Sequence, residues 1–195
     1  MIPAALASAV VIASFALFML VAQVVRARNM ARRGASVRRA RGVADSATYF
    51  FWLPYAIVWL RPGPSLDLGA PLVAGGLALA IGGIAFALWA MATLGRHYDL
   101  TLEVHGGHEV VRSGPYAVVR HPLYTGLAIH SLGAILATGN LIFTGGTLLV
   151  TLPIFVLRAR AEERLLRAEL GGDYERYARE VPMLVPFRRW PRRAG

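Results

Sequence analysis

Long uncharged blocks of apolar residues alternate with Arg-rich stretches along this chain. The blocks 2–25 and 68–95 carry no charged residue, and the second is rich in Gly and Ala. A helix rises 1.5 Å per residue, so about 20 apolar residues cross the hydrocarbon core of a bilayer. Each block therefore predicts one membrane-spanning helix. Block 2–25 lacks the basic start and the short apolar core of a signal peptide, which favours a retained span.

A shorter apolar block, 46–60, is dense in Tyr, Phe and Trp. Tyr and Trp favour the interface between membrane and water. We expect a tilted or partly interfacial span here, with a kink at Pro54. The turn residues of 61–64 then lead into the next block.

The last apolar block, 122–157, has no formal charge and is too long for one span. A single helix would overshoot the hydrocarbon core by about 20 Å. Gly139-Asn140 near its middle is a turn dipeptide, so the block predicts a helical hairpin of 122–138 and 141–157. The predicted fold class is all-α: an integral membrane protein of about five transmembrane helices, with an amphipathic cytosolic helix over 164–170 near the C-terminus.

The placement of Arg predicts the orientation of these spans. Seven Arg follow the first block within 26–41, and with five spans the loop 96–121 and the tail from 158 lie on the same side. The opposite side holds only Arg61 and Asp67. Cytoplasmic loops are enriched in basic residues, so we expect an external N-terminus and a cytoplasmic C-terminus. The net charge of +10 is then explained by topology and anionic lipids rather than by nucleic acid.

Composition narrows the chemistry. Hydrophobic residues make up 56% of the chain and charged residues 16%, against about 25% in soluble domains. The chain has no Cys, which excludes disulfides, thiolate catalysis and cysteine-held zinc. We expect a three-helix membrane region, 1–95, and a catalytic region, 96–195, that work as a single unit.

Polar chemistry concentrates between the third and fourth spans. Four of the five His lie in 97–121, and His105 and His108 have a spacing seen in metal sites, but no third ligand stands nearby. Arg120-His121-Pro122 opens the fourth span, where free N–H groups of a helix start attract a carboxylate. The alternative is an ordinary interfacial anchor of Arg and aromatic residues.

A second polar pair follows the last span. Arg158 and Glu162 are four residues apart and share one helix face, and Arg160 and Glu163 form a parallel pair. Solvated ion pairs of little energetic value are one interpretation. The functional interpretation places a substrate anion at Arg158 and a cofactor cation at Glu162.

The residues of 108–126, with Gly114-Pro115-Tyr116 and Arg120-His121-Pro122-Leu123-Tyr124, resemble the isoprenylcysteine carboxyl methyltransferase family. Phospholipid methyltransferases share a looser form of the pattern. Glu162-Glu163, Gly171, Tyr174, Tyr177 and the prolines of 181–186 extend the resemblance, which covers about 97–187.

The resemblance implies S-adenosyl-L-methionine as cofactor, S-adenosyl-L-homocysteine as product, and a lipophilic or lipid-modified acceptor in the membrane, foremost a carboxylate. It also implies the residue roles. Arg158, which would hold the acceptor carboxylate, and Arg120 are the candidate catalytic residues. The candidate cofactor-binding residues are His108, Glu109, Val110, Val111, Tyr116, His121, Pro122, Leu123, Tyr124 and Glu162. Two positions depart from the family: Thr101 stands where a Gln is usual, and Glu109 replaces a less charged residue.

Other functions compete with methyl transfer to a carboxylate. A phospholipid amine or a thiol would need a base, for which His121 or Glu163 are the candidates. A membrane reductase of the steroid-reductase type would use NADPH, although no G-x-G-x-x-G motif is present. A transporter would place polar residues within its spans, where His130 is the main exception, more typical of helix packing.

Overall fold

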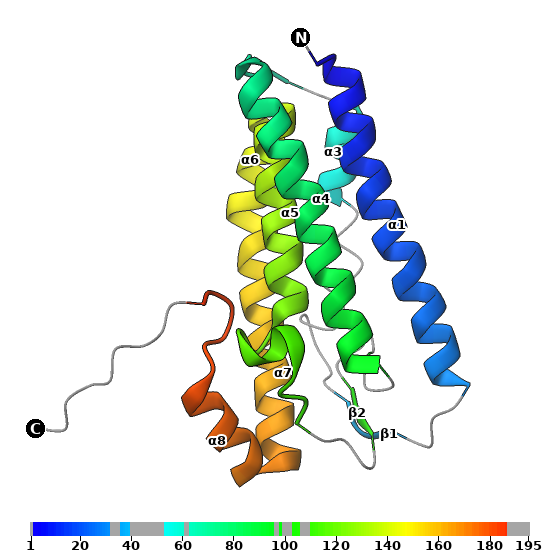
Figure 1. Cartoon of the computed structure of the whole chain (residues 1–195), viewed down its shortest axis with the longest axis vertical. Coiled ribbons are helices and arrows are strands. Elements are labelled where there is room, and N and C mark those ends of the chain that lie inside the picture. The colour runs from blue at the N-terminus through cyan, green and yellow to red at the C-terminus, as the bar shows by residue number, and fades with distance from the viewer. Residues whose placement is uncertain are drawn as a thin grey trace, which may run out of the picture.

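The protein is a bundle of long helices with a small two-stranded sheet at one end (Figure 1). The computed structural model describes residues 2–31, 36–39, 53–60, 63–95, 98, 103–105 and 110–186. The elements in chain order are α1 Ala4–Met30, β1 Ser36–Arg39, α3 Leu53–Leu60, α4 Gly69–Leu94, β2 Glu103–His105, η3 Gly114–Ala117, α5 Pro122–Thr138, α6 Leu141–Gly146, η4 Thr147–Thr151, α7 Leu152–Leu170 and α8 Gly172–Glu180. The short strands β1 and β2 pair antiparallel and add a small element that the apolar pattern does not predict.

Three helical runs of the described chain are long and apolar enough to cross a membrane: 4–29, 69–94 and 141–170. Helix α5 is a shorter apolar helix of 17 residues. These helices are those of a multi-pass membrane protein, as predicted. The count of five spans stays a prediction, because only 53–60 of the block 46–60 is described.

The predicted hairpin turn at Gly139-Asn140 is confirmed. Gly139 ends α5 in the left-handed conformation, with φ of +60°, and a Cβ here would collide with the backbone oxygen of Leu66. Asn140 caps α6 by accepting a 2.7 Å hydrogen bond from the amide of Phe143. Both residues therefore serve the reversal of the chain that their types predict.

Helices α4 and α5 pack so closely that side chains are excluded at their contact. A Cβ on Gly83 would lie 2.4 Å from the amide nitrogen of His130, and one on Gly133 would lie 2.4 Å from that of Ala80. Gly76 and Gly126 complete the contact in the same way. Small residues allow such close approach between helices in lipid, where apolar burial does not drive association. The Gly and Ala of block 68–95 thus fix the centre of the bundle.

The last long helix is continuous from Leu141 to Leu170, past the predicted end of the span at 157. Its π-helical turn, Thr147–Thr151, precedes Pro153. Proline donates no backbone hydrogen bond, so a local change of helical register is expected here. Because the helix is continuous, the positions of Arg158 and Glu162 are fixed relative to the rest of the bundle.

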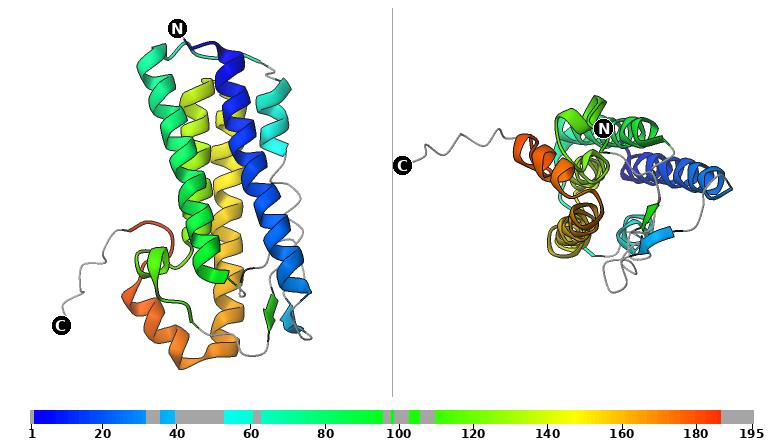
Figure 2. Two further views of the ribbon diagram at one scale, coloured as in Figure 1. Left: turned by 45° about the vertical axis from the view of Figure 1, so that its right-hand side comes forward. Right: turned by 90° about the horizontal axis from the view of Figure 1, so that it is seen from below.

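The segment 164–170, predicted to be an amphipathic helix, is the last part of α7, and a further short helix, α8, follows it. Gly171 has a φ of +53° and separates α8 from α7. The apolar face of α8 packs on the protein: Tyr174 and Tyr177 are buried, and the Tyr177 hydroxyl donates to the backbone oxygen of Tyr116 at 2.7 Å. Helix α8 therefore packs against the end of the bundle where α7 ends (Figure 2).

His130 has the packing role that the sequence favours. It is fully buried on α5, and its Nδ1 lies 3.1 Å from the backbone oxygen of Ala80 on α4. Its ring stacks with Phe15 and Tyr55, whose own ring centroids lie 3.6 Å apart. An aromatic cluster thus joins α1, α3 and α5.

Candidate functional site

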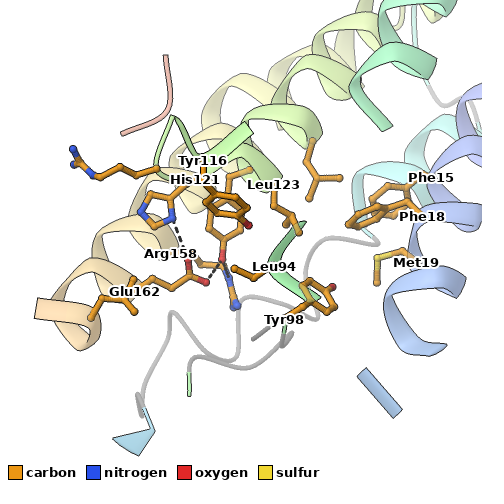
Figure 3. A pocket seen from close by; sticks show the side chains of 14 residues that line it. Phe15, Phe18, Met19, Leu94, Tyr98, Tyr116, His121, Leu123, Arg158 and Glu162 are labelled. Atoms are coloured by element: carbon orange, nitrogen blue, oxygen red, sulfur yellow. Dashed lines mark hydrogen bonds and ion pairs between the residues drawn. The ribbon is translucent and has the colours of Figure 1, made fainter. Parts of the chain in front are cut away.

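A cavity opens where α1, α4, α5 and α7 meet, towards the end of the bundle that carries α8 (Figure 3). It encloses about 780 Å³ of space, part of it open to the surroundings. Its lining residues are Phe15, Phe18, Met19, Leu94, Tyr98, Tyr116, Arg120, His121, Leu123, Tyr124, Leu127, Arg158, Glu162 and Leu166. Phe15, Phe18 and Met19 form an apolar wall on one side, and Arg158, Glu162 and His121 lie opposite (Figure 3).

Glu162 is the centre of the polar side. One carboxylate oxygen accepts a hydrogen bond of 2.7 Å from the Tyr124 hydroxyl, and the other lies 3.2 Å from Nδ1 of His121. The Glu162 side chain keeps 30% of its surface exposed, so it can still receive a ligand. Arg158 is 3% exposed and donates from Nε to the same Tyr124 hydroxyl at 3.3 Å. Tyr124 therefore connects an acidic and a basic group in one wall.

Local structure explains this convergence. Residues four apart on α7 share a face, which aims Arg158 and Glu162 at the same cavity. Pro122 begins α5, as its fixed φ favours, and this places His121 at the N-cap and Tyr124 in the first turn. The backbone amide of His121 donates to the oxygen of Met183, so the C-terminal segment also holds this corner.

Glu163 belongs to a second network, which Arg120 and His121 connect to the cavity wall. Its carboxylate accepts from Nε of Arg120 at 2.7 Å and pairs with Arg167 at 2.9 Å. The guanidinium of Arg120 also donates to the backbone oxygens of Ala178 and Val181. This network ties α7, α8 and the loop before α5 together.

Burial and charge shift the protonation equilibria at this corner. Burial alone would lower the pKa of His121, but the hydrogen bond to Glu162 and the nearby carboxylate of Glu163 raise it above its usual value. Burial, reinforced by the negative charge of Glu162, raises the pKa of Tyr116 well above its usual value. Tyr116 is therefore a neutral phenol at physiological pH.

The structure gathers most of the predicted site residues. Seven of them line the cavity: Tyr116, Arg120, His121, Leu123, Tyr124, Arg158 and Glu162. Pro122 is fully buried beside them, and Val110 and Val111 are half-buried but are not lining residues. His108, Glu109 and Thr101 lie outside the described residues, as does the side chain of His105. Arg160 is exposed, and Glu163 pairs with Arg120 and Arg167 rather than with it.

Sequence reasoning missed the apolar wall and one polar residue. Phe15, Phe18 and Met19 sit in a uniformly apolar block, where no periodicity separates a cavity wall from a lipid-facing surface. Tyr98 lies between polar residues and has no neighbouring motif. Only the three-dimensional fold brings these residues to the cavity.

Comparison with known proteins relates part of this chain to one family. The sequence profile of the isoprenylcysteine carboxyl methyltransferase family matches residues 76–168, which include α4, α5 and Glu162. Residues 76–168 are therefore similar to this family. The resemblance predicted from the sequence is confirmed.

Individual relatives carry related names. The chain is 32% identical over 114 residues to a probable protein-S-isoprenylcysteine O-methyltransferase of Oryza sativa subsp. indica, covering 57% of this chain and 60% of the relative. It is 39% identical over 80 residues to the protein-S-isoprenylcysteine O-methyltransferase of Schizosaccharomyces pombe, covering 41% of this chain and 34% of that relative. It is 31% identical over 157 residues to methanethiol S-methyltransferase 1 of Bradyrhizobium diazoefficiens, covering 72% of this chain and 50% of that relative. The chain thus spans less than two thirds of the length of these relatives.

Proposed function

We propose that this protein is a membrane methyltransferase that uses S-adenosyl-L-methionine and methylates a lipophilic acceptor, foremost a carboxylate. One observation carries the proposal: Glu162 and the buried Arg158 share a cavity with an apolar wall supplied by α1. A carboxylate for a cationic cofactor, a guanidinium for an anionic acceptor and a hydrophobic surface are what this reaction requires in one place.

The residues present fit the cofactor. Glu162 can pair with its ammonium group, because a charge-assisted hydrogen bond to a carboxylate is strong and the side chain is partly open. The rings of Tyr98 and Tyr116 offer faces for the adenine and for a cation. When bound, the cofactor supplies a methyl group on a sulfonium. We propose that His121 to Tyr124 surround its amino-acid part and that 108–111 lie along the adenosyl part.

Arg158 would receive the acceptor. A guanidinium binds a carboxylate through two parallel hydrogen bonds, and this one lies in the polar wall opposite Phe15 and Phe18. A carboxylate is already an anionic nucleophile, so no general base is required. The protein then contributes alignment, worth up to about 7–11 kcal/mol, and exclusion of water from the carboxylate. The wall from α1 and Leu94 supports the prediction that the regions 1–95 and 96–195 work as one unit.

A thiol acceptor is the second candidate. The relative that covers the largest share of this chain among those named above is a methanethiol S-methyltransferase. A thiol must lose its proton during methylation, so a base would be needed, and His121 is the nearest candidate in the cavity wall. Acceptor screening with lipophilic acids and thiols side by side separates the two candidates.

Calorimetric titration of S-adenosylhomocysteine into the detergent-purified protein tests the cofactor assignment. We expect saturable binding that Glu162→Gln weakens about tenfold or more, since removing one charge of a paired set costs roughly 1.5–3 kcal/mol. Glu180→Gln at the exposed end of α8 is the matched control and should bind normally. Binding of NADPH in a parallel titration, with none of S-adenosylhomocysteine, would assign the protein to the reductases instead.

A further inference from the structure

His121 lies between two carboxylates. Its Nδ1 is 3.2 Å from an oxygen of Glu162, and its Nε2 is 3.5 Å from an oxygen of Glu163. The side chain is only 5% exposed, so water cannot replace either partner freely. Both ring nitrogens of this buried histidine therefore face groups that can only accept hydrogen bonds.

A neutral imidazole cannot serve both sides. It carries one N–H, and its second nitrogen presents a lone pair, which would point at a carboxylate oxygen. The doubly protonated imidazolium has two donors and a positive charge, and it suits this geometry. The raised pKa of His121 has the same origin, because the two carboxylates outweigh the effect of burial.

Among the residues that the structure describes, the remaining neighbours of His121 do not supply another negative charge. From α7, Arg158 reaches Tyr124, and Arg167 pairs with Glu163. Arg120, next in the chain, also pairs with Glu163, and the ring of Tyr124 on α5 stacks on His121. Tyr116 of η3 lines the same cavity as a neutral phenol. Glu162 is thus the one carboxylate of this described cluster that is shared between His121 and the cavity.

We propose that His121 releases a proton when the cofactor binds: it holds Glu162 as an imidazolium in the open cavity, and the incoming ammonium group takes its place there. This inference rests on the proposed function. Two cations would otherwise compete for one carboxylate in a poorly hydrated site, where an unpaired charge is costly. One imidazolium N–H bond breaks, its proton passes to solvent, and the ring remains as neutral imidazole.

The proposal fixes the direction of the pH dependence. Below the folded-state pKa of His121, each binding event must expel a proton, so affinity should rise by up to about tenfold per pH unit. Above that pKa the histidine is already neutral, and affinity should become independent of pH. An increase in affinity as the pH falls would contradict the proposal.

The test counts protons by calorimetry. S-adenosylhomocysteine, which has the ammonium group, is titrated at pH 6.5 in phosphate and in imidazole, two buffers that work at this pH and whose ionisation enthalpies differ. We expect a binding enthalpy that depends on the buffer and corresponds to release of close to one proton. The matched probe is 5′-methylthioadenosine, which keeps the adenosyl thioether but lacks the amino acid, and its binding should release none.

Two variants complete the design. His121→Gln leaves a neutral donor near Glu162 and should abolish both the proton release and the pH dependence. Tyr124→Phe removes the other hydrogen bond of Glu162 but keeps His121, so binding should weaken while the proton is still released. A wild-type enthalpy that is independent of buffer overturns the inference and leaves the proposed function standing. Absence of S-adenosylhomocysteine binding overturns both.

Discussion

Arg120 and Arg158 carry the same charge in one corner of the protein, but their contacts differ. The guanidinium of Arg120 is engaged by Glu163 and by the backbone oxygens of Ala178 and Val181. Arg158 is bonded through Nε to a tyrosine hydroxyl in the cavity wall. We therefore infer that Arg120 positions α8 and the loop before α5, whereas Arg158 is the residue placed to contact an acceptor.

Replacing Arg158 should separate acceptor binding from cofactor binding. Arg158→Lys keeps the charge but loses the planar fork that matches a carboxylate. We expect kcat/KM for a lipophilic acid to fall about 100-fold, while binding of S-adenosylhomocysteine changes less than threefold, because charge-paired contacts are worth roughly 2–5 kcal/mol. Methyl-transfer assays and calorimetry on the same preparation provide both values.

Arg160→Lys is the matched control for that substitution. It lies two residues further along α7 and is exposed, so both activities should stay at the wild-type level. Normal turnover of acids by Arg158→Lys would remove the acceptor role from Arg158. Retained turnover of a thiol with lost turnover of acids would show that the two acceptors bind differently.

At the scale of elements, the α4–α5 contact sets the spacing of the whole bundle. Gly82 and Gly83 are adjacent on α4 but face different surroundings. A Cβ on Gly83 would overlap the backbone of α5, whereas one on Gly82 would meet no atom within 4 Å. The two residues thus provide a comparison in which only the direction of the added methyl group changes.

Gly83→Ala should destabilise the protein, and Gly82→Ala should not. The added methyl group of Gly83→Ala must push α4 and α5 apart, and such overpacking costs about 1–3 kcal/mol. In Gly82→Ala the higher helix propensity of alanine, up to about 1 kcal/mol, has no opposing clash. Thermal unfolding in detergent measures both. Equal stability of the two variants would mean that the helices do not pack as closely as the structure shows.

Local sequence patterns predicted the helices and turns better than they predicted which residues line the cavity. Charge-free blocks and turn residues located α4, α5 and the Gly139-Asn140 reversal, since these depend on neighbours in the sequence. The spacing of Arg158 and Glu162 placed them on one helix face, and the family resemblance implied their roles. The pairing of Glu163 with Arg120 spans 43 residues, and no local periodicity encodes such a contact.

At the scale of the whole molecule, polar chemistry and apolar surface are divided along the long axis. The cavity, α8 and the small sheet lie towards one end, and the start of α1 and the turn after α5 lie at the other (Figures 1 and 2). The helices α1, α4, α5 and the run α6 to α7 enclose the cavity between these ends. We therefore propose that a polar cofactor enters from the end of the bundle and that a lipophilic acceptor comes from the side.

The direction in which this axis crosses the membrane can be tested because the chain has no Cys. Helices α1, α4 and the continuous run from α6 to α7 point one way along the bundle, and α5 points the other way (Figure 1). The predicted five spans would place the termini on opposite sides of the membrane. The Arg-rich side is expected to be cytoplasmic, so the exposed Ser65, between α3 and α4, should lie outside and the exposed Arg179 of α8 inside. In intact cells a membrane-impermeant maleimide should label Ser65→Cys and should reach Arg179→Cys only after permeabilisation.

The opposite pattern would reverse the orientation and move the cofactor entrance to the external face, away from the cytosolic supply of S-adenosylmethionine. Labelling of both variants in intact cells would instead require an even number of spans between them and overturn the five-span topology.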